Sequence, residues 1–350
     1  MKIAILLPYK ENFSPEYPGA VSLFVYETTK KSKFKKDITV FGNTNFSKRF
    51  KLRYKNIELK KKPFTSQTKN YVKKFINLEK RNNSTIIEIH NRPSYIQILA
   101  KEIENKIFTL YFHNDPLSMD GSQTIKERKN LLKICYKIIF NSSWSKKRFL
   151  EGLENKFVNS EKLLVFHQSA SKGSINLVNK KKKWITFVGK LNKAKGYDIF
   201  SSSIKKILNK YPEWSAKVIG DEKREKINLN HKRANILGFR KHNEVLGILK
   251  KSSIAVACSR WEEPFGRTSL EASANGCAVV ITNKGGLPET VTDAKILKKL
   301  NTKNLTKTLE ELIKKPEERK KLQRLSIKNF YLTHEFVTSA MDNYRSEKIS

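Results

Sequence analysis

The chain has 350 residues, of which 38% are apolar and 10% aromatic, and a formal net charge of +38. That length and composition suit two ordinary domains with buried cores and argue against a disordered chain. No apolar run approaches 18 residues, and Met1–Pro8 is too short for a signal peptide and lacks its cleavage site, so we expect neither a membrane span nor a leader. The three cysteines lie in apolar contexts without a C-x-x-C pair, which predicts a reducing compartment and no zinc site.

The first half alternates short apolar runs, typical of buried parallel strands, with helical stretches. The predicted strands are Lys2–Leu7, Ile38–Gly42, Thr85–Ile89, Ile107–Phe112, Lys137–Asn141 and Leu163–Phe166. Helices are predicted at Ala20–Lys30 and Pro93–Glu104. This alternation predicts an α/β domain with a doubly wound, Rossmann-like sheet over residues 1–170.

The positive charge concentrates early in the chain, where residues 30–81 hold 18 Lys or Arg against three acids. Codon bias towards lysine explains an excess of charge but not its concentration, so we favour attraction to an anionic membrane surface. The candidate contacts share one helical stretch and are Lys69, Lys73, Lys74, Lys80 and Arg81. Its apolar side either lies in the membrane interface or packs on the core, and the sequence leaves both alternatives open.

The second half repeats the pattern after a polar tract, residues 171–183, which we interpret as a linker. The strands predicted for a second doubly wound domain, residues 184–330, are Trp184–Val188, Ala216–Ile219, Ala234–Leu237, Ile254–Ala257 and Ala278–Ile281. The helices are Tyr197–Lys210, Asn243–Lys250, Arg267–Asn275, Leu305–Lys314 and Pro316–Asn329. Residues 331–350 contain a last amphipathic stretch, His334–Glu347.

Polar and small residues follow several strands of the first domain, at the edge where open α/β sheets bind ligands. A small pair, Gly19-Ala20, opens the first helix. His90-Asn91-Arg92 and His113 end two neighbouring strands and face the crevice if the strand assignments hold. Most lone histidines are structural, so these positions are candidates only.

The second domain offers two cations after its first strand, in Val188-Gly-Lys-Leu-Asn-Lys-Ala-Lys-Gly196. Gly189 lets the chain turn, and Lys190 and Lys195 can aim at the carboxyl end of the strand. Two cations there would stabilise a departing diphosphate. In a chain so rich in lysine, the alternative is two solvated side chains.

The most informative stretch is Trp261–Gly276, in which a strand, a loop and a helix follow one another. Glu263 lies on the loop, the helix begins near Arg267, and Glu271 lies about one turn later. The open amides and partial positive charge of a helix N-terminus suit a phosphate. Two carboxylates with the amides of residues 265–267 between them predict a site for a phosphorylated ligand rich in hydroxyls.

The pattern E-P-F-G-R-T-S-L-E, followed by G-C-A-V-V and by Gly285-Gly-Leu-Pro-Glu289, resembles the retaining glycosyltransferases of family 4. The resemblance implies the two-domain GT-B fold, with a cleft between the domains and a final helix that packs back on the first domain. It also implies a nucleotide-sugar donor, UDP- or GDP-linked, and no bound metal or other cofactor. The family has Arg where this chain has Lys190, so the charge is retained but the bidentate fork is lost.

The resemblance assigns roles to residues at matching positions. Glu271 would hold the ribose, and Glu263 the sugar and phosphate; His113, at the later strand, would be the active-site histidine beside Lys190 and Lys195. The implied donor-binding residues are Gly19, Ala20, Gly189, Lys190, Lys195, Gly220, Phe239, Arg240, Glu263, Phe265, Gly266, Arg267 and Glu271. The acceptor would meet His90, Asn91 and Arg92.

We therefore expect a hexose-transferring enzyme whose acceptor is a lipid-linked, lipopolysaccharide or other cell-envelope glycan, at the cytoplasmic face of the inner membrane. Two alternatives remain open. A nucleic-acid-binding protein would explain the charge but not the carboxylate pattern, and no recognised nucleic-acid motif is present. A non-catalytic GT-B relative that only binds membranes would be expected to lack Lys195 or Glu271, and both are present.

Overall fold

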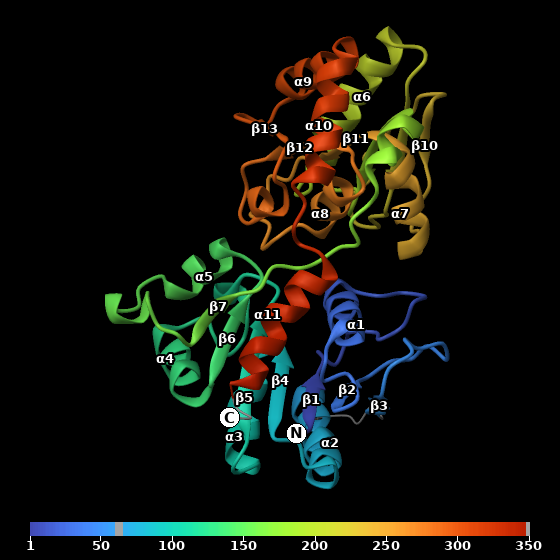
Figure 1. Cartoon of the computed structure of the whole chain (residues 1–350). Coiled ribbons are helices and arrows are strands. Elements are labelled where there is room, and N and C mark those ends of the chain that lie inside the picture. Colours follow the sequence, from blue (N-terminus) through green and yellow to red (C-terminus); the bar gives the residue numbers. More distant parts are fainter. Residues whose placement is uncertain (60–65, 348–350) are drawn as a thin grey trace. The chain divides into compact units, whose positions relative to one another are not determined.

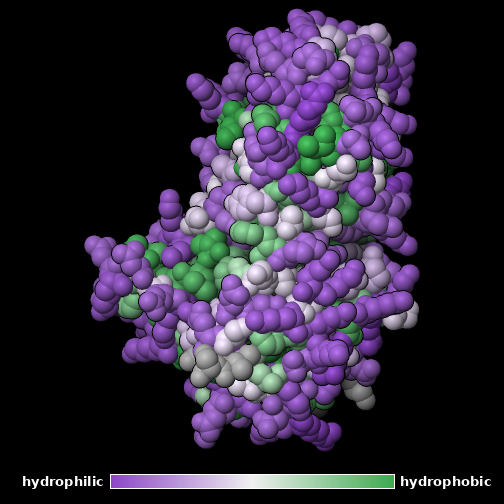
Figure 2. Space-filling view, in the orientation of Figure 1, coloured by the Kyte–Doolittle hydropathy of each residue, from purple (hydrophilic) through white to green (hydrophobic). Residues whose placement is uncertain are grey.

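The structure is a computed structural model that describes residues 1–59 and 66–347. The chain divides into two compact units (Figure 1). The first comprises residues 1–169 together with the C-terminal helix α11 (His334–Ser346), and the second comprises Ala170–Thr333. Hydrophilic residues cover most of the face shown in Figure 2, as the large net charge predicts.

The first unit contains a parallel sheet in the order β3-β2-β1-β4-β5-β6-β7, counted over the described residues. Its strands are β1 (Ile3–Leu6), β2 (Ile38–Gly42), β3 (Tyr54–Asn56), β4 (Ile86–His90), β5 (Ile107–Phe112), β6 (Lys137–Phe140) and β7 (Leu163–Val165). Its other helices are α1 (Ala20–Lys31), α2 (Gln67–Asn82), α3 (Pro93–Glu102), α4 (Ile125–Ile134) and α5 (Ser143–Leu150), with short 3-10 turns η1 (Pro116–Ser118) and η2 (Asn155–Phe157). The six predicted strands are all present. β3 was missed because Tyr54-Lys55-Asn56 is a half-buried edge strand without an apolar run.

The second unit contains a parallel sheet in the order β10-β9-β8-β11-β12-β13. Its strands are β8 (Lys182–Val188), β9 (Ser215–Ile219), β10 (Ala234–Ile236), β11 (Ser252–Ala257), β12 (Ala278–Thr282) and β13 (Lys295–Leu297). Its helices are α6 (Tyr197–Lys210), α7 (His242–Lys251), α8 (Arg267–Ala274), α9 (Thr302–Lys314) and α10 (Pro316–Lys328), with 3-10 turns η3 (Ile175–Lys180) and η4 (Leu287–Thr290). The α/β fold with two doubly wound sheets, predicted from the sequence, is confirmed.

Both sheets reverse their strand order once, between β1 and β4 in the first unit and between β8 and β11 in the second. Chain connections leave the sheet in opposite directions at such a switch point, so the carboxyl ends of the two strands open a crevice for a ligand. The loops that follow β8 and β11 therefore define where to look for the site in the second unit.

The tract 171–183, interpreted as a linker, lies within the second unit and contains η3 and the start of β8. Val178 is buried, and Gly173 N donates to Ala274 O at 2.8 Å. The Lys181 ammonium donates to the carbonyls of Asn275 (2.6 Å) and Leu249 (3.1 Å). Hydrogen bonds to backbone carbonyls and one buried apolar side chain dock this segment, which is why its sequence shows no periodicity.

The basic stretch of the first unit forms α2, and its apolar side belongs to the core. Tyr71, Val72 and Phe75 are completely buried. Of the two alternatives for this stretch, the structure therefore supports packing of its apolar side on the core. The alternative, in which the apolar side lies in a membrane interface, is wrong. The cations Lys69, Lys73, Lys80 and Arg81 remain exposed, whereas the Lys74 ammonium donates to Glu58 O at 2.5 Å.

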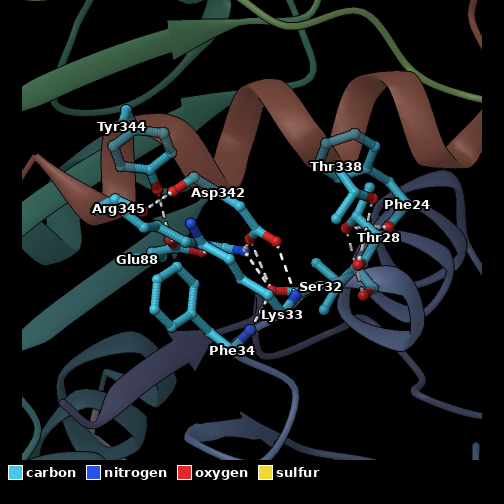
Figure 3. A network of polar contacts seen from close by, with 12 residues as sticks. Phe24, Thr28, Ser32, Lys33, Phe34, Glu88, Thr338, Asp342, Tyr344 and Arg345 are labelled. Atoms are coloured by element: carbon cyan, nitrogen blue, oxygen red, sulfur yellow. Dashed lines mark hydrogen bonds and ion pairs between the residues drawn. The ribbon is translucent and has the colours of Figure 1, made fainter.

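A network of buried polar contacts fixes α11 to the first unit (Figure 3). The guanidinium of Arg345 meets both oxygens of Glu88, on β4, at 2.8 Å each, and both side chains are wholly buried. Asp342 accepts from Ser32 Oγ at 2.7 Å and from Lys33 N at 2.8 Å, after the end of α1. The last helix thus completes the first unit although its residues come from the other end of the chain.

Candidate active site

An ion pair joins the loops that follow β8 and β11, at the switch point of the second sheet. The Lys195 ammonium contacts Glu263 Oε1, which also accepts a hydrogen bond from Ser259 Oγ. Glu263 is 8% exposed. The backbone N–H of Lys195 donates to Asn192 Oδ1 at 3.0 Å. Asn192 and Ser259 support the pair, and neither was anticipated from the sequence, because single polar residues in loops carry no distinctive pattern.

Two glycines make this approach of the loops possible. Gly196 has φ +71°, and a Cβ there would lie 1.9 Å from Cys258 O, at the end of β11. Gly285, the first residue of the G-G-L-P-E sequence, has φ +59°, and its Cβ would lie 2.1 Å from Glu263 O. Larger residues would push both loops away from the strand end, so these glycines fix where Lys195 and Glu263 meet.

Glu271 lies on α8, and its carboxylate is buried between two cationic or basic side chains. Its Oε1 lies 2.7 Å from Arg267 Nε and 2.7 Å from His242 Nε2. Burial alone would raise the pKa of Glu271, but the charge of Arg267 and the hydrogen bond from His242 outweigh it and lower the pKa. The carboxylate is therefore held ionised. His242, the first residue of α7, was missed because a lone histidine in a Lys-rich stretch gives no signal.

The N-terminus of α8 lies between the two carboxylates in sequence. Gly266 is its N-cap residue, and no side chain of the described residues caps the helix. The Phe265 side chain is buried, so this segment can offer a ligand its backbone amides rather than the aromatic ring. Open amides at a helix start are suited to an anion such as phosphate.

The remaining predicted donor residues lie on neighbouring loops at the same edge of the sheet. Gly189 N donates to Ile219 O at 3.0 Å, and Gly220 N donates to Gly238 O at 2.9 Å, so the ends of β8, β9 and β10 are closely packed. Lys190, Phe239 and Arg240 are exposed there. The structure thus brings Lys195 to Glu263 and Arg267 to Glu271, while Lys190 lies outside both ion pairs.

In the first unit the two candidate histidines form a buried pair. His90 Nδ1 and His113 Nε2 lie 3.0 Å apart, and their rings stack. Burial lowers the pKa of His90 to about 3 and that of His113 well below its ordinary range, so both rings are neutral. His113 Nδ1 has no hydrogen-bond partner among the described residues.

Asn91 and Arg92, predicted acceptor contacts, mainly organise this strand end. Asn91 Oδ1 accepts from the backbone N–H of His113 (3.1 Å) and of Asn114 (3.2 Å), and Arg92 Nη1 donates to Asn91 O at 2.6 Å. His90 is fully buried. His90 and Asn91 therefore have little surface to offer an acceptor.

The Gly19-Ala20 pair opens α1, and a carboxylate missed by the sequence analysis lies against it. Glu11 Oε1 accepts from Ser22 N at 2.8 Å, and a Cβ on Gly19 would come within 2.3 Å of that oxygen. Burial raises the pKa of Glu11. A carboxylate of this chain thus occupies the start of α1.

Over residues 1–59 and 66–347, no group of three or more His, Cys, Asp or Glu side chains is arranged to hold a metal ion. Within the same residues, no helix is both long and apolar enough to cross a bilayer.

Comparison with known proteins places these features in context. Residues 171–328 match the family model described as glycosyl transferases group 1. The chain is 25% identical over 277 residues to the spore coat protein SA of Bacillus subtilis (strain 168), covering 71% of this chain and 74% of that protein. It is 31% identical over 137 residues to the lipopolysaccharide core biosynthesis mannosyltransferase LpsB of Rhizobium meliloti (strain 1021), covering 36% of this chain and 38% of that protein. Several such matches span less than half of the relative's length.

Among solved structures, Anabaena HepE in complex with UDP and glucose superimposes with a TM-score of 0.77 at 16% identity, over 99% of this chain and 100% of that chain. This likeness shows that the fold is GT-B. The group 1 model covers nearly all of the second unit, which is the part of the chain that this comparison likens to glycosyltransferases.

We predict that Glu271→Gln raises the KM for the nucleotide-sugar donor proposed below at least tenfold, because donor hydroxyls would lose a charged acceptor worth about 1.5–3 kcal/mol. Steady-state kinetics measure this, with Glu318→Gln, an exposed carboxylate on α10, as the matched loss of charge. Unchanged donor KM in folded Glu271→Gln protein would contradict the assignment.

The same substitution should also lower stability, since the half-buried Arg267 loses its counter-charge. Because the folded-state pKa of Glu271 is lowered, the ionised carboxylate stabilises the fold above its ordinary pKa of 4.5, and this contribution is lost as pH falls through the lowered value. The difference in Tm between wild type and Glu271→Gln should therefore be full at pH 7 and shrink in acid.

Proposed function

We propose that this protein is a retaining glycosyltransferase of family 4 that transfers a hexose from a nucleotide-sugar donor held by the second unit. The observation that carries the proposal is the Lys195–Glu263 ion pair at the β8–β11 switch point, with Glu271 one helix turn into α8. The group 1 match over residues 171–328 supports it, because it covers both carboxylates and both lysines.

The proposed donor contacts follow from the charges at this edge. Lys195, exchanging Glu263 for a phosphate, and the exposed Lys190 would neutralise the diphosphate, and the amides of α8 would add hydrogen bonds. Glu271 would accept hydrogen bonds from the ribose hydroxyls, and Gly220, Phe239 and Arg240 would lie towards the base. Glu263 would then turn to the transferred sugar.

Catalysis would rest on electrostatic stabilisation of the leaving group. As the bond from the anomeric carbon to the phosphate oxygen breaks, negative charge grows on the diphosphate, and fixed cations stabilise it more in the transition state than in the ground state. Retention means that the acceptor oxygen bonds to the anomeric carbon on the face from which the diphosphate departs, and the acceptor hydroxyl would give its proton to the departing phosphate oxygen. His113 would contribute a neutral ring, whose buried Nδ1 makes no hydrogen bond to the described residues.

UDP-linked sugars are the first donors to test, since HepE was crystallised with UDP and glucose. The proposed acceptor is a lipid-linked or cell-envelope glycan, for which the likeness to LpsB and the basic first unit are the support.

A donor screen tests the enzyme assignment. With purified protein and UDP- or GDP-sugars, one donor should release its nucleoside diphosphate, and release should persist in EDTA. Lys195→Ala should lower kcat by two orders of magnitude or more, as removal of a preorganised charge-stabilising group does. Full activity of Lys195→Ala would contradict the mechanism, and loss in EDTA restored by magnesium would contradict metal independence. Thermal protection by oligonucleotides but not by donors would favour the nucleic-acid alternative.

We further propose that the first unit binds anionic membranes through the exposed cations of α2, without insertion of its apolar side. Each cation near the surface would add about 1 kcal/mol of binding free energy. Lys69, Lys73, Lys80 and Arg81 changed together to Gln should release the protein from phosphatidylglycerol vesicles in sedimentation. Wild-type binding should be absent on neutral vesicles and weaken with salt.

The matched control removes the same charge from the second unit, by changing its exposed Lys206, Lys303, Lys307 and Lys314 to Gln. The α2 hypothesis requires this control to sediment like wild type. Equal loss of binding in both variants would instead indicate a non-specific effect of net charge.

A further inference from the structure

A polar cavity of about 960 Å³ lies in the first unit, and none of the candidate active-site residues lines it. It is formed by the chain segments that follow β1, β2 and β3 and by the first residue of α2, Gln67. The end of β1 borders the β1–β4 switch point, and the ends of β2 and β3 lie to one side of it. The volume is that of a site for a small organic ligand.

The walls of the cavity are rich in side-chain amides, contributed by Asn43, Asn45, Asn56 and Gln67. Each amide carries both donors and acceptors, as the hydroxyl groups of a sugar require. Tyr9 adds an aromatic ring, which contacts the Tyr71 ring. The backbone N–H of Tyr9 donates to Tyr95 Oη at 3.3 Å, which fixes the chain at this residue.

Hydrogen bonds fix the orientation of two of these amides. Asn56 Oδ1 accepts from Thr44 N at 2.8 Å and from Tyr54 Oη at 2.9 Å, so the group it leaves for a ligand is the Nδ2 donor. Asn43 Nδ2 donates to Tyr9 O at 3.1 Å, which leaves its Oδ1 as an acceptor. A preformed donor and acceptor reduce the entropy lost on binding.

The charged side chains of the cavity are Lys10, Arg49 and Glu58, two cations against one carboxylate. The Arg49 guanidinium lies over the Tyr54 ring at 5.3 Å and the Lys10 ammonium over the Tyr9 ring at 5.5 Å, so each cation has an aromatic support. The excess of positive charge favours a ligand with an anionic group.

We propose that this cavity binds the acceptor and that the bound portion is a saccharide bearing a phosphate or carboxylate group. That the bound saccharide is the acceptor rests on the proposed function, but the binding of an anionic saccharide can be tested without a donor. It moves the expected acceptor contacts from His90 and Asn91, which are buried, to the amides and cations at the ends of β1, β2 and β3.

Saturation-transfer NMR on the full-length protein tests the binding, with glucose 6-phosphate, glucuronate, glucose and inorganic phosphate as probes. The two charged sugars should bind at least tenfold more tightly than glucose. The Lys10→Gln/Arg49→Gln variant should lose most of that preference. The matched control, Lys48→Gln/Lys51→Gln, removes two exposed cations of the same region that do not line the cavity, and should behave like wild type.

Gln67→Leu should weaken the binding of both charged sugars, because it replaces an amide of the cavity wall by an apolar side chain. Equal binding of glucose, displacement of the sugars by inorganic phosphate alone at equal concentration, or wild-type binding by both cavity variants would overturn the proposal. A further comparison measures the affinity for a free hexose phosphate and for a lipid-linked hexose phosphate in neutral phosphatidylcholine vesicles. It shows whether the lipid-linked or the free form of the ligand binds more tightly.

Kinetics then separate this inference from the proposed function. With an active donor, Lys10→Gln/Arg49→Gln should raise the acceptor KM about tenfold and leave the donor KM unchanged. If the charged sugars bind but no donor turns over, the proposed function fails and the cavity remains a saccharide site. If a donor turns over but the cavity variants match wild type in both assays, the function stands and this inference is wrong.

Discussion

The contact between Lys195 and Glu263 is the constraint on which the candidate site depends. Both side chains are half-buried or buried at a strand end, where an unpaired charge is costly, so each requires the other while no ligand is present. The pair can form only because Gly196 and Gly285 let two loops lie against the backbone of β11 and of Glu263. A diphosphate that takes over Lys195 would free Glu263, so the ion pair also provides a simple way for donor binding to change the site.

Buried charge fixes position elsewhere in the molecule as well. Glu88 and Arg345 are wholly buried and satisfy each other through two hydrogen bonds, which sets the register of α11 on β4. Glu271 is likewise fixed in position, by its ion pair with Arg267 and its hydrogen bond with His242. Such pairs add little net stability over apolar packing, but each permits one arrangement, since a shift of either partner leaves a charge buried alone. In the first unit, the buried ion pair fixes the position of helix α11. In the second unit, it fixes the carboxylate of Glu271, a candidate ligand-binding group.

The sequence predicted most of the fold, because buried parallel strands are short apolar runs and their helices are strongly periodic. The sequence analysis failed for β3 and β13, which are edge strands too short to give a pattern. It also failed for the tract 171–183, which docks through hydrogen bonds to backbone carbonyls. The lysines and carboxylates of the second unit could be found because they follow strand ends in a recognisable pattern. Asn192, Ser259 and His242 could not, since their importance arises only from which loops the sheet order brings together.

Calorimetric titration with UDP most directly tests the central claim that Lys195 serves the donor diphosphate and that Glu263 neutralises it beforehand. The account predicts opposite effects of two substitutions: Lys195→Ala should weaken UDP binding at least tenfold, whereas Glu263→Gln should leave it unchanged or tighten it, because the ammonium no longer has a competing carboxylate. If both substitutions weaken UDP equally, or if neither changes its affinity in folded protein, the ion pair is a structural feature of the loops and the account is wrong.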